Sequence, residues 1–188
     1  MSLEYAPRGL VGMLTPQANT TVEPEFNILW PRGVAMINAR LMSGKASMTA
    51  RLVDYFDNYA ASLAQFANAP VGVVAAACTG ASYLAGRERE AAVARDIAER
   101  HKHPFITAAV AVVDALTVLK AKRIGLVSPY PDDSTRRVWP IGRATASRLR
   151  MWRRCSMRAA HFIRSIASAD RAPQRRCSRS RTSRSMPS

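Results

Sequence analysis

The sequence lacks any segment that would direct the chain into or across a membrane. Its first residues have neither the basic nor the apolar region of a signal peptide, and its longest strongly apolar run, near 71–78, is too short to span a bilayer. It has only three cysteines, an odd number without tight spacing, which excludes a disulfide framework. We therefore expect a protein of the reducing cytoplasm, with no membrane partner.

Acidic residues and lysine are almost absent beyond residue 133. Residues 134–188 hold fifteen Arg, no Lys, no Glu and one Asp, a net charge of +14. Residues 1–133 hold 13 Lys and Arg against 12 Asp and Glu, a net charge of +1. The front part has the charge balance of a soluble metabolic enzyme. We predict an α/β catalytic half-domain over 1–133 and an Arg- and Ser-rich tail over 134–188.

Two interpretations of the tail stay open. It shows no sustained helical or strand period, as in an irregular, disordered segment. Alternatively it is translated out of frame, because many Arg without Lys or Glu are easily produced by a shifted frame of a GC-rich gene. A functional basic tail would bind nucleic acid electrostatically, without sequence preference. Since it lacks interleaved aromatic residues for base stacking, we expect no specific nucleic-acid partner.

Short apolar runs alternate with amphipathic segments over the first 128 residues. Helices are predicted between 47 and 68, from 78 to about 100 and over 108–120, and 16–24 is predicted as a polar loop. Strands are predicted at 8–15, 34–41, 71–77 and 123–128, and 104–107 is predicted as a brief strand or turn. This alternation predicts a parallel-sheet, flavodoxin-like α/β domain. Ligands bind such sheets at the carboxyl ends of the strands, where the polar segments 15–25, 78–82 and 128–133 fall.

Cys78 is the strongest candidate for chemistry. It stands where the apolar run 71–77 turns into a predicted helix, with Thr79 and Ser82 as candidate caps. Backbone N–H groups and the helix dipole at such a turn lower the pKa of a thiol and favour the thiolate, and the same donors can hold a carboxylate. The competing interpretation is an inert buried cysteine, since free Cys packs as a small apolar side chain.

Asn19 and Tyr130 follow two other predicted strands. The amide of Asn19 can donate to a carboxylate, and the hydroxyl of Tyr130 can bond an anionic substrate or a developing enolate. Taken singly, Asn19 is better explained as a turn residue and Tyr130 as a packed tyrosine. A functional role for Asn19 and Tyr130 is favoured because, with Cys78, they occupy the ends of three different predicted strands.

Three motifs occur in a fixed order: GMLTPQANTTVEPE at 12–25, ACTGAS at 77–82 and RIGLVSPY at 123–130. Together they resemble the maleate isomerases and arylmalonate-decarboxylase-like proteins of the aspartate/glutamate racemase superfamily, over about 1–137. The resemblance implies two similar α/β halves with the substrate between them, of which this domain is the first. It also implies one cysteine in each half, no metal or organic cofactor, and a homo-oligomer for the intact family member.

The resemblance also assigns roles. Cys78 is implied to be the nucleophile or base, Tyr130 to stabilise the enediolate-like charge, and Asn19 and Thr79 to bind carboxylates. The implied activity is cofactor-independent isomerisation of a small dicarboxylate, of the maleate-to-fumarate type, through a cysteine thiolate. Amino-acid racemisation and arylmalonate-type decarboxylation stay as alternatives, although cysteine at the first position of the CTGAS turn favours isomerase or racemase.

No second catalytic cysteine is recognisable. Cys155 and Cys177 lie among arginines, without an apolar strand before them or a small-residue turn after them. We therefore expect a truncated chain that lacks the second half of the site. An inactive fragment is the third hypothesis, beside an enzyme and a nucleic-acid binder.

Overall fold

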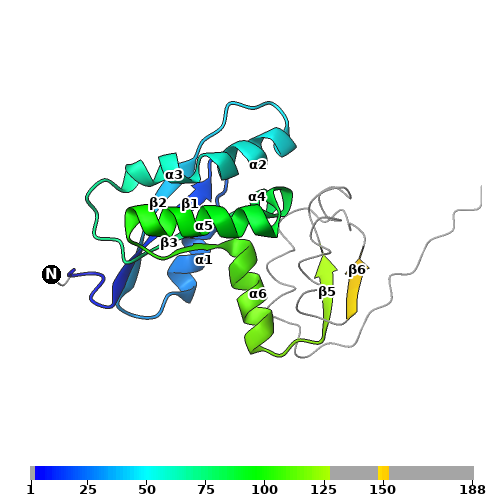
Figure 1. The fold of residues 1–188 in the computed structure, drawn as a ribbon. Coiled ribbons are helices and arrows are strands. Elements are labelled where there is room, and N and C mark those ends of the chain that lie inside the picture. The colour runs from blue at the N-terminus through cyan, green and yellow to red at the C-terminus, as the bar shows by residue number, and fades with distance from the viewer. Residues whose placement is uncertain (1–2, 128–147, 153–188) are drawn as a thin grey trace, which may run out of the picture. The chain divides into compact units, whose positions relative to one another are not determined.

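The computed structural model describes residues 3–127 and 148–152. The chain divides into two units, Met1–Arg153 and Arg154–Ser188, and all described residues belong to the first. Its main element is a four-stranded parallel sheet in the order β2-β1-β3-β4 (Figure 1). The strands are β1 (Gly9–Pro16), β2 (Val34–Leu41), β3 (Val73–Ala76) and β4 (Phe105–Thr107). The predicted α/β class is confirmed.

Helices connect these strands. They are α1 (Val22–Leu29), α2 (Met48–Asp57), α3 (Tyr59–Ser62) with the 3-10 turn η1 (Leu63–Phe66), α4 (Thr79–Ala85), α5 (Arg87–His101) and α6 (Ala108–Val118). The hydroxyl of Ser47 accepts from the N–H of Ala50 and so caps α2, as Thr107 caps α6. Within the described residues, no helix combines the length and the apolarity needed to cross a membrane.

Apolar clusters cover both faces of β1, because successive strand residues point to opposite faces. Val11 and Met13 pack with Val22 of α1. Leu14 belongs to the larger cluster, which contains Tyr59 of α3. A parallel sheet buried on both faces explains why β1 and β3 are continuous apolar runs rather than alternating ones.

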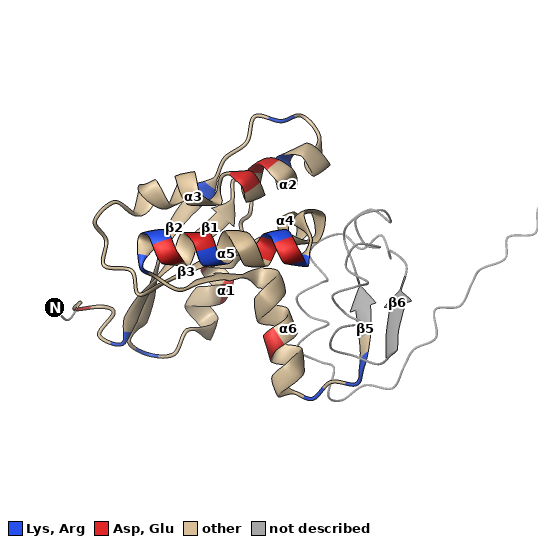
Figure 2. Cartoon of the chain, viewed as in Figure 1, with Lys and Arg blue, Asp and Glu red and all other residues tan. Residues whose placement is uncertain are grey.

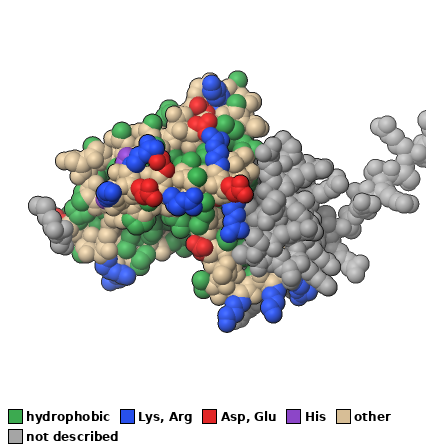
Figure 3. Space-filling model, viewed as in Figure 1, with side chains coloured by type: hydrophobic (Ala, Val, Ile, Leu, Met, Phe, Trp, Pro, Cys, Tyr) green, Lys and Arg blue, Asp and Glu red, His purple; other side chains and the backbone are tan. Residues whose placement is uncertain are grey.

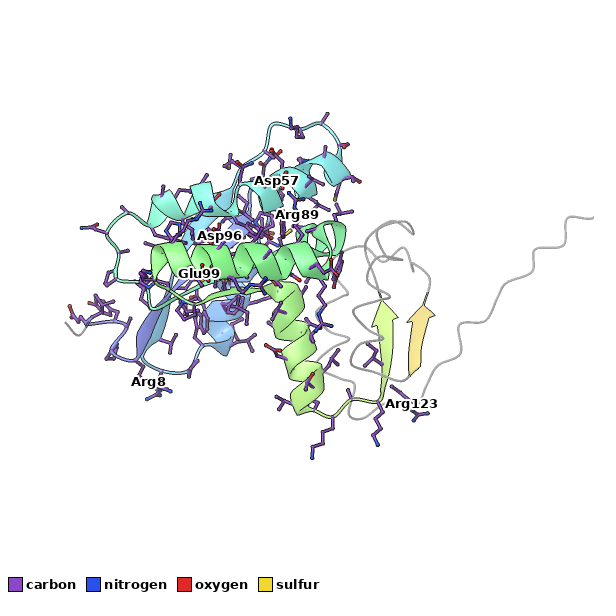
Figure 4. All side chains as sticks on the ribbon, in the orientation of Figure 1. Arg8, Asp57, Arg89, Asp96, Glu99 and Arg123 are labelled. Atoms are coloured by element: carbon purple, nitrogen blue, oxygen red, sulfur yellow. The ribbon has the colours of Figure 1, made fainter. Side chains whose placement is uncertain are left out.

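Helices α2 and α5 are joined at the surface of the larger cluster. Arg89 of α5 donates to Asp57 of α2 at 2.6 Å, and its guanidinium lies 5.2 Å from the ring centroid of Phe56 (Figure 4). Charges of both signs run along α5 (Figure 2) and lie among apolar side chains on this face of the molecule (Figure 3). This face therefore carries a mixed pattern of charge, unlike the strongly basic sequence beyond residue 133.

Three helix predictions need correction. The helix predicted between 47 and 68 is divided into α2, α3 and η1, and Asn58 is the C-cap of α2. Residues 22–29 form helix α1, although its first three residues fall in the predicted polar loop 16–24. Pro24 is compatible with it because the first turn of a helix has no intrahelical partner for the missing N–H. The predicted helix from 78 to about 100 is two helices, α4 and α5, separated by Gly86 with φ of +81°. That backbone conformation is open to glycine and interrupts the helix.

A separate parallel pair joins β5 (Arg123–Val127) to β6 (Arg148–Trp152). Strand β6 falls inside the predicted irregular tail, and its sequence does carry a strand signal, since Leu149 and Met151 alternate with arginines. The interpretations offered for the rest of the tail lie outside the described residues.

Gly12 of β1 should tolerate no side chain. A Cβ at this position would lie 2.9 Å from Cε2 of Phe66, a packed ring of the larger core cluster. We expect Gly12→Ala to lower the free energy of unfolding by about 1–3 kcal/mol, measured by urea denaturation.

The matched control is Gly44→Ala, because a Cβ at Gly44 meets nothing within 4 Å. That variant should stay within about 0.5 kcal/mol of the wild type. If overpacking is the cause, Gly12→Ala combined with Phe66→Leu should lose less stability than the sum of the two single changes. Equal stability of the two glycine variants would contradict this packing.

Candidate functional site

A cavity of about 400 Å³ lies at the carboxyl ends of β1, β3 and β4. Its polar lining residues are Asn19, Cys78, Thr79 and Thr107. The rest of its described lining is apolar: Met13, Pro16, Phe26, Ala75, Ala76, Ala77, Ile106, Ala108 and Ala111. The cavity therefore offers a few polar groups in an apolar wall, as ligand sites of α/β proteins commonly do.

The structure brings three of the four predicted site residues together. Asn19, Cys78 and Thr79 all line this cavity, Asn19 from the loop after β1 and the other two from the turn after β3. Tyr130 lies outside the described residues, as do Cys155 and Cys177. The cavity stands where the strand-end rule predicts it.

Cys78 occupies the first position of the turn that opens α4. Its backbone is extended, with φ of −143° and ψ of 89°, and its side chain is only 5 % exposed. The following residues Gly80, Ala81 and Ser82 are buried, so the small side chains of this turn let α4 begin directly against the sheet. The backbone N–H groups of Gly80 and Ala81 lie near the thiol, although the side chain of Cys78 makes no capping hydrogen bond of good geometry.

Two opposing effects act on the thiol. Burial raises the pKa of Cys78, whereas the nearby backbone N–H groups of Ala81 and Gly80 lower it. Burial is the larger effect, so the pKa of Cys78 lies above its ordinary value. The predicted lowering of the pKa is therefore wrong as a net effect. Its donors are present, but removing a thiolate from water outweighs them.

Asn19 is held by the helix that follows it. Its Oδ1 accepts from the N–H of Thr21 at 2.9 Å and from the N–H of Val22 at 3.0 Å. The turn chemistry that competes with a binding role is therefore present. It uses only the carbonyl end of the side chain, and among the described residues the amide Nδ2 of Asn19 makes no hydrogen bond. An amide fixed in this way can still donate to an anion.

Thr107 and Glu90 are parts of the site region that sequence reasoning missed. Thr107 lines the cavity, and its hydroxyl donates to Glu90 at 2.5 Å. Glu90 is 3 % exposed, although the charged stretch 88–90 is typical of a solvated helix face. Thr107 could have been identified from the sequence, because it ends a predicted strand or turn immediately before a predicted helix. The burial of Glu90 depends on Thr107, which lies seventeen residues away, so the sequence around Glu90 does not indicate it.

Tyr59 is fully buried in the core cluster that also contains Cys78. Burial raises the pKa of Tyr59, and negative charge at Cys78 and at Glu90 raises it further, while the hydroxyl of Ser82 acts in the opposite direction. Within the described part of the chain, the hydroxyl oxygens of Tyr59 and Ser82 make no hydrogen bond of good geometry. Tyr59 is therefore a neutral donor near Cys78 at any physiological pH.

A known family matches most of the chain. The family model described as arylmalonate decarboxylase matches residues 11–153 of this chain, and so includes the Asn19 loop and the Cys78 turn. The chain belongs to the arylmalonate decarboxylase family. This membership confirms the resemblance that the three motifs predict, and family members are enzymes. No significant match is found among curated proteins.

Solved structures support the same fold for this family member. The maleate isomerase Iso from Pseudomonas putida S16 is 21 % identical, with a TM-score of 0.65 over 85 % of this chain and 73 % of that one. The maleate cis-trans isomerase from Nocardia farcinica is 20 % identical, with a TM-score of 0.66 over 86 % and 73 %. An unliganded arylmalonate decarboxylase is 21 % identical, with a TM-score of 0.58 over 86 % and 73 %. At these identities the likeness shows a shared fold.

The raised pKa of Cys78 predicts the pH dependence of its alkylation. A thiol whose pKa lies above its ordinary value holds less thiolate at each pH, so its reaction with iodoacetamide should reach half its maximal rate above the usual value of about 8.5. The rate is followed by mass spectrometry on the peptide that contains Cys78. The midpoint of the pH profile is the informative quantity, because limited access slows the reaction at every pH alike.

Cys78→Ser supplies the control, since it reports the reactions of Cys155 and Cys177 alone. A midpoint at or below that of a free cysteine would show that the N–H donors of the turn outweigh burial. That result would contradict the electrostatic balance described above.

Proposed function

We propose that this chain carries the first half of the active site of a cysteine-dependent isomerase that acts on a small dicarboxylate, of the maleate-to-fumarate type. The observation that carries the proposal is the meeting of Asn19, Cys78 and Thr79 in one cavity at the carboxyl edge of the sheet. A thiol and groups able to bind a carboxylate are the chemistry that such a reaction needs.

The proposed reaction begins with addition of the Cys78 thiolate to one carbon of the double bond. The new S–C bond moves the π electrons toward the adjacent carboxylate, which becomes enediolate-like. Rotation about the resulting single bond and elimination of the thiolate then give the trans isomer, with no net change in atoms or electrons. The amide of Asn19 is suitably placed in the cavity wall to donate to a carboxylate, and Thr79 follows the nucleophile directly.

Ionisation of Cys78 is the demanding step of this scheme. The two N–H donors of the turn offset part of the effect of burial but not all of it. None of the described residues that line the cavity carries a carboxylate or an imidazole. The proton must therefore pass to the substrate or to a group supplied from outside the described residues. In the two-half arrangement that the family resemblance implies, the second half is the expected source.

Two relatives support a covalent route. The Nocardia farcinica maleate isomerase has been crystallised as a mutant with a covalently bound succinylcysteine intermediate. The Pseudomonas putida isomerase has been crystallised, also as a mutant, with maleate. A succinyl group on cysteine is what addition of a thiolate to maleate or fumarate produces once the adjacent carbon has gained a proton. We extend this chemistry to Cys78 because the cysteine follows a buried strand at the wall of the cavity.

Decarboxylation of a substituted malonate is the second candidate. The family model that matches the chain is that of arylmalonate decarboxylase, and the apolar wall formed by Met13, Phe26 and Ile106 suits a substrate with an apolar substituent. In that reaction a cysteine thiol returns a proton to the enediolate left by loss of carbon dioxide. Cysteine at the first position of the turn after β3 favours isomerisation or racemisation over decarboxylation.

The proposal predicts that the purified chain converts maleate to fumarate. Proton NMR distinguishes the vinyl signals of the two isomers, and phenylmalonate in a parallel sample tests decarboxylation by the appearance of phenylacetate. Cys78→Ala should reduce isomerisation to the uncatalysed rate, because no other described residue in the cavity carries a thiol.

The matched controls are Cys155→Ala and Cys177→Ala, which should keep the activity because neither has the sequence context of a catalytic cysteine. Turnover of phenylmalonate alone would favour the second candidate. Failure of the folded wild-type protein to turn over either compound would contradict activity of this chain.

A further inference from the structure

A polar network that the proposed reaction does not use lies between β1, β2 and the first turn of α1. Arg40 of β2 donates from Nη1 to the carbonyl oxygen of Asn19 at 2.8 Å and, more weakly, to that of Pro16 at 3.4 Å. Its Nη2 bonds Oε1 of Glu23 in α1. One guanidinium therefore ties together the end of β1, the loop that carries Asn19 and the helix that follows.

The carboxylate of Glu23 is held from a second side. Its Oε1 also accepts from Nδ2 of Asn38 at 2.9 Å, and Oδ1 of Asn38 accepts from the hydroxyl of Thr15 at 2.5 Å. Thr15 is fully buried, whereas the side chains of Arg40 and Glu23 are 36 % and 27 % exposed. The ion pair is thus partly shielded from solvent and anchored to the sheet, unlike an isolated pair on the surface.

This network leaves Asn19 little freedom except at one atom. The backbone N–H of Asn19 donates to the carbonyl oxygen of Pro16 at 2.9 Å, and its own carbonyl oxygen accepts from Arg40. Its Oδ1 accepts from the N–H groups that open α1. The amide Nδ2 is the polar group of Asn19 that these contacts do not use, and the residue lines the cavity that holds Cys78.

We propose that Arg40 and Glu23 are positioning residues that fix the direction of the Asn19 amide before an anion binds. Arg40 suits this role because its planar fork reaches a carbonyl oxygen and a carboxylate at once, which an ammonium group cannot do with the same geometry. A donor already held in direction loses little conformational entropy when a ligand arrives, so affinity depends on the network even though neither residue lines the cavity. The identity of the anion rests on the proposed function, whereas the positioning of Asn19 does not.

The direct test is the side-chain amide signal of Asn19 in a ¹⁵N-labelled sample of the whole chain. Asn19→Ala identifies the signal by removing it. We expect Arg40→Met to move the pair of amide proton signals toward the positions of a freely rotating asparagine and to lower the order parameter of the amide. Arg40→Lys keeps the charge, so its Asn19 amide signals should lie between those of the wild type and those of Arg40→Met.

Arg100→Met is the matched control, because it removes an arginine from the exposed pair with Asp96 on α5, away from this loop. It should leave the Asn19 signal in place. Circular dichroism and thermal unfolding show whether each variant is folded. If Arg40→Met does not fold, Glu23→Gln carries the same test, since it removes the charge and keeps an acceptor for Asn38. An unchanged Asn19 signal in a folded Arg40→Met or Glu23→Gln protein overturns the proposal.

A second measurement asks what the positioned amide binds. Protection of Cys78 from iodoacetamide by increasing maleate gives an apparent dissociation constant. Arg40→Met and Asn19→Ala should both raise it about ten-fold, which is about 1.4 kcal/mol, and Arg100→Met should not. Absence of protection in the wild type would contradict the proposed function, and the NMR result would still decide the positioning. Protection that depends on Asn19 but not on Arg40 would overturn the positioning and leave the proposed function standing.

Discussion

The parallel pairing of β1 with β2 and β3 is the constraint on which the rest of the site depends. The register joins β1 to β2 from Gly9 and Val34 to Pro16 and Leu41, and joins it to β3 from Val11 to Leu14. Because parallel strands end at the same edge of a sheet, the loop after β1 and the turn after β3 leave the core side by side. Asn19 and Cys78, 59 residues apart in the sequence, therefore meet in one cavity without any contact between them being encoded locally.

The strands were predictable from their apolar runs, and the helices less so where backbone geometry or local polarity intervenes. Strand β2 has the bounds that its apolar run predicts, and β1 is displaced by one residue. Helix α1 was missed because Pro24 and the polar residues around it are typical of a loop, although a proline is harmless in a first turn. Gly86 gave no clear signal either, since a single glycine is tolerated inside many helices and only its positive φ shows the break.

The features of the site that depend on local sequence were also predictable, whereas those that depend on tertiary packing were not. The position of Cys78, after a buried strand and before small residues, follows from the sequence, and so do its N–H donors. The direction in which the pKa of Cys78 shifts does not follow from the sequence. It depends on burial by α2, α3 and α5, whose residues belong to the same core cluster as Cys78. Glu90 shows the same limit. Its sequence neighbours are charged, and only the fold places Thr107 beside it to satisfy a carboxylate removed from water.

The electrostatic requirements at Cys78 and at Asn19 are opposite. At Cys78 the neutral thiol is favoured at rest, because burial raises its pKa. In the proposed reaction the site therefore stabilises charge only as the reaction creates it, which lowers a barrier rather than tightening the binding of substrate. At Asn19 a neutral donor must already point toward the anion, and the charges that hold it, on Arg40 and Glu23, neutralise one another outside the cavity. A lone arginine in the cavity wall would attract a carboxylate more strongly, but it would stabilise the bound substrate and the enediolate alike. In the proposed function, a neutral amide held by an ion pair behind it binds the substrate carboxylate less strongly than an arginine would, so less of the binding energy is common to the substrate and the enediolate.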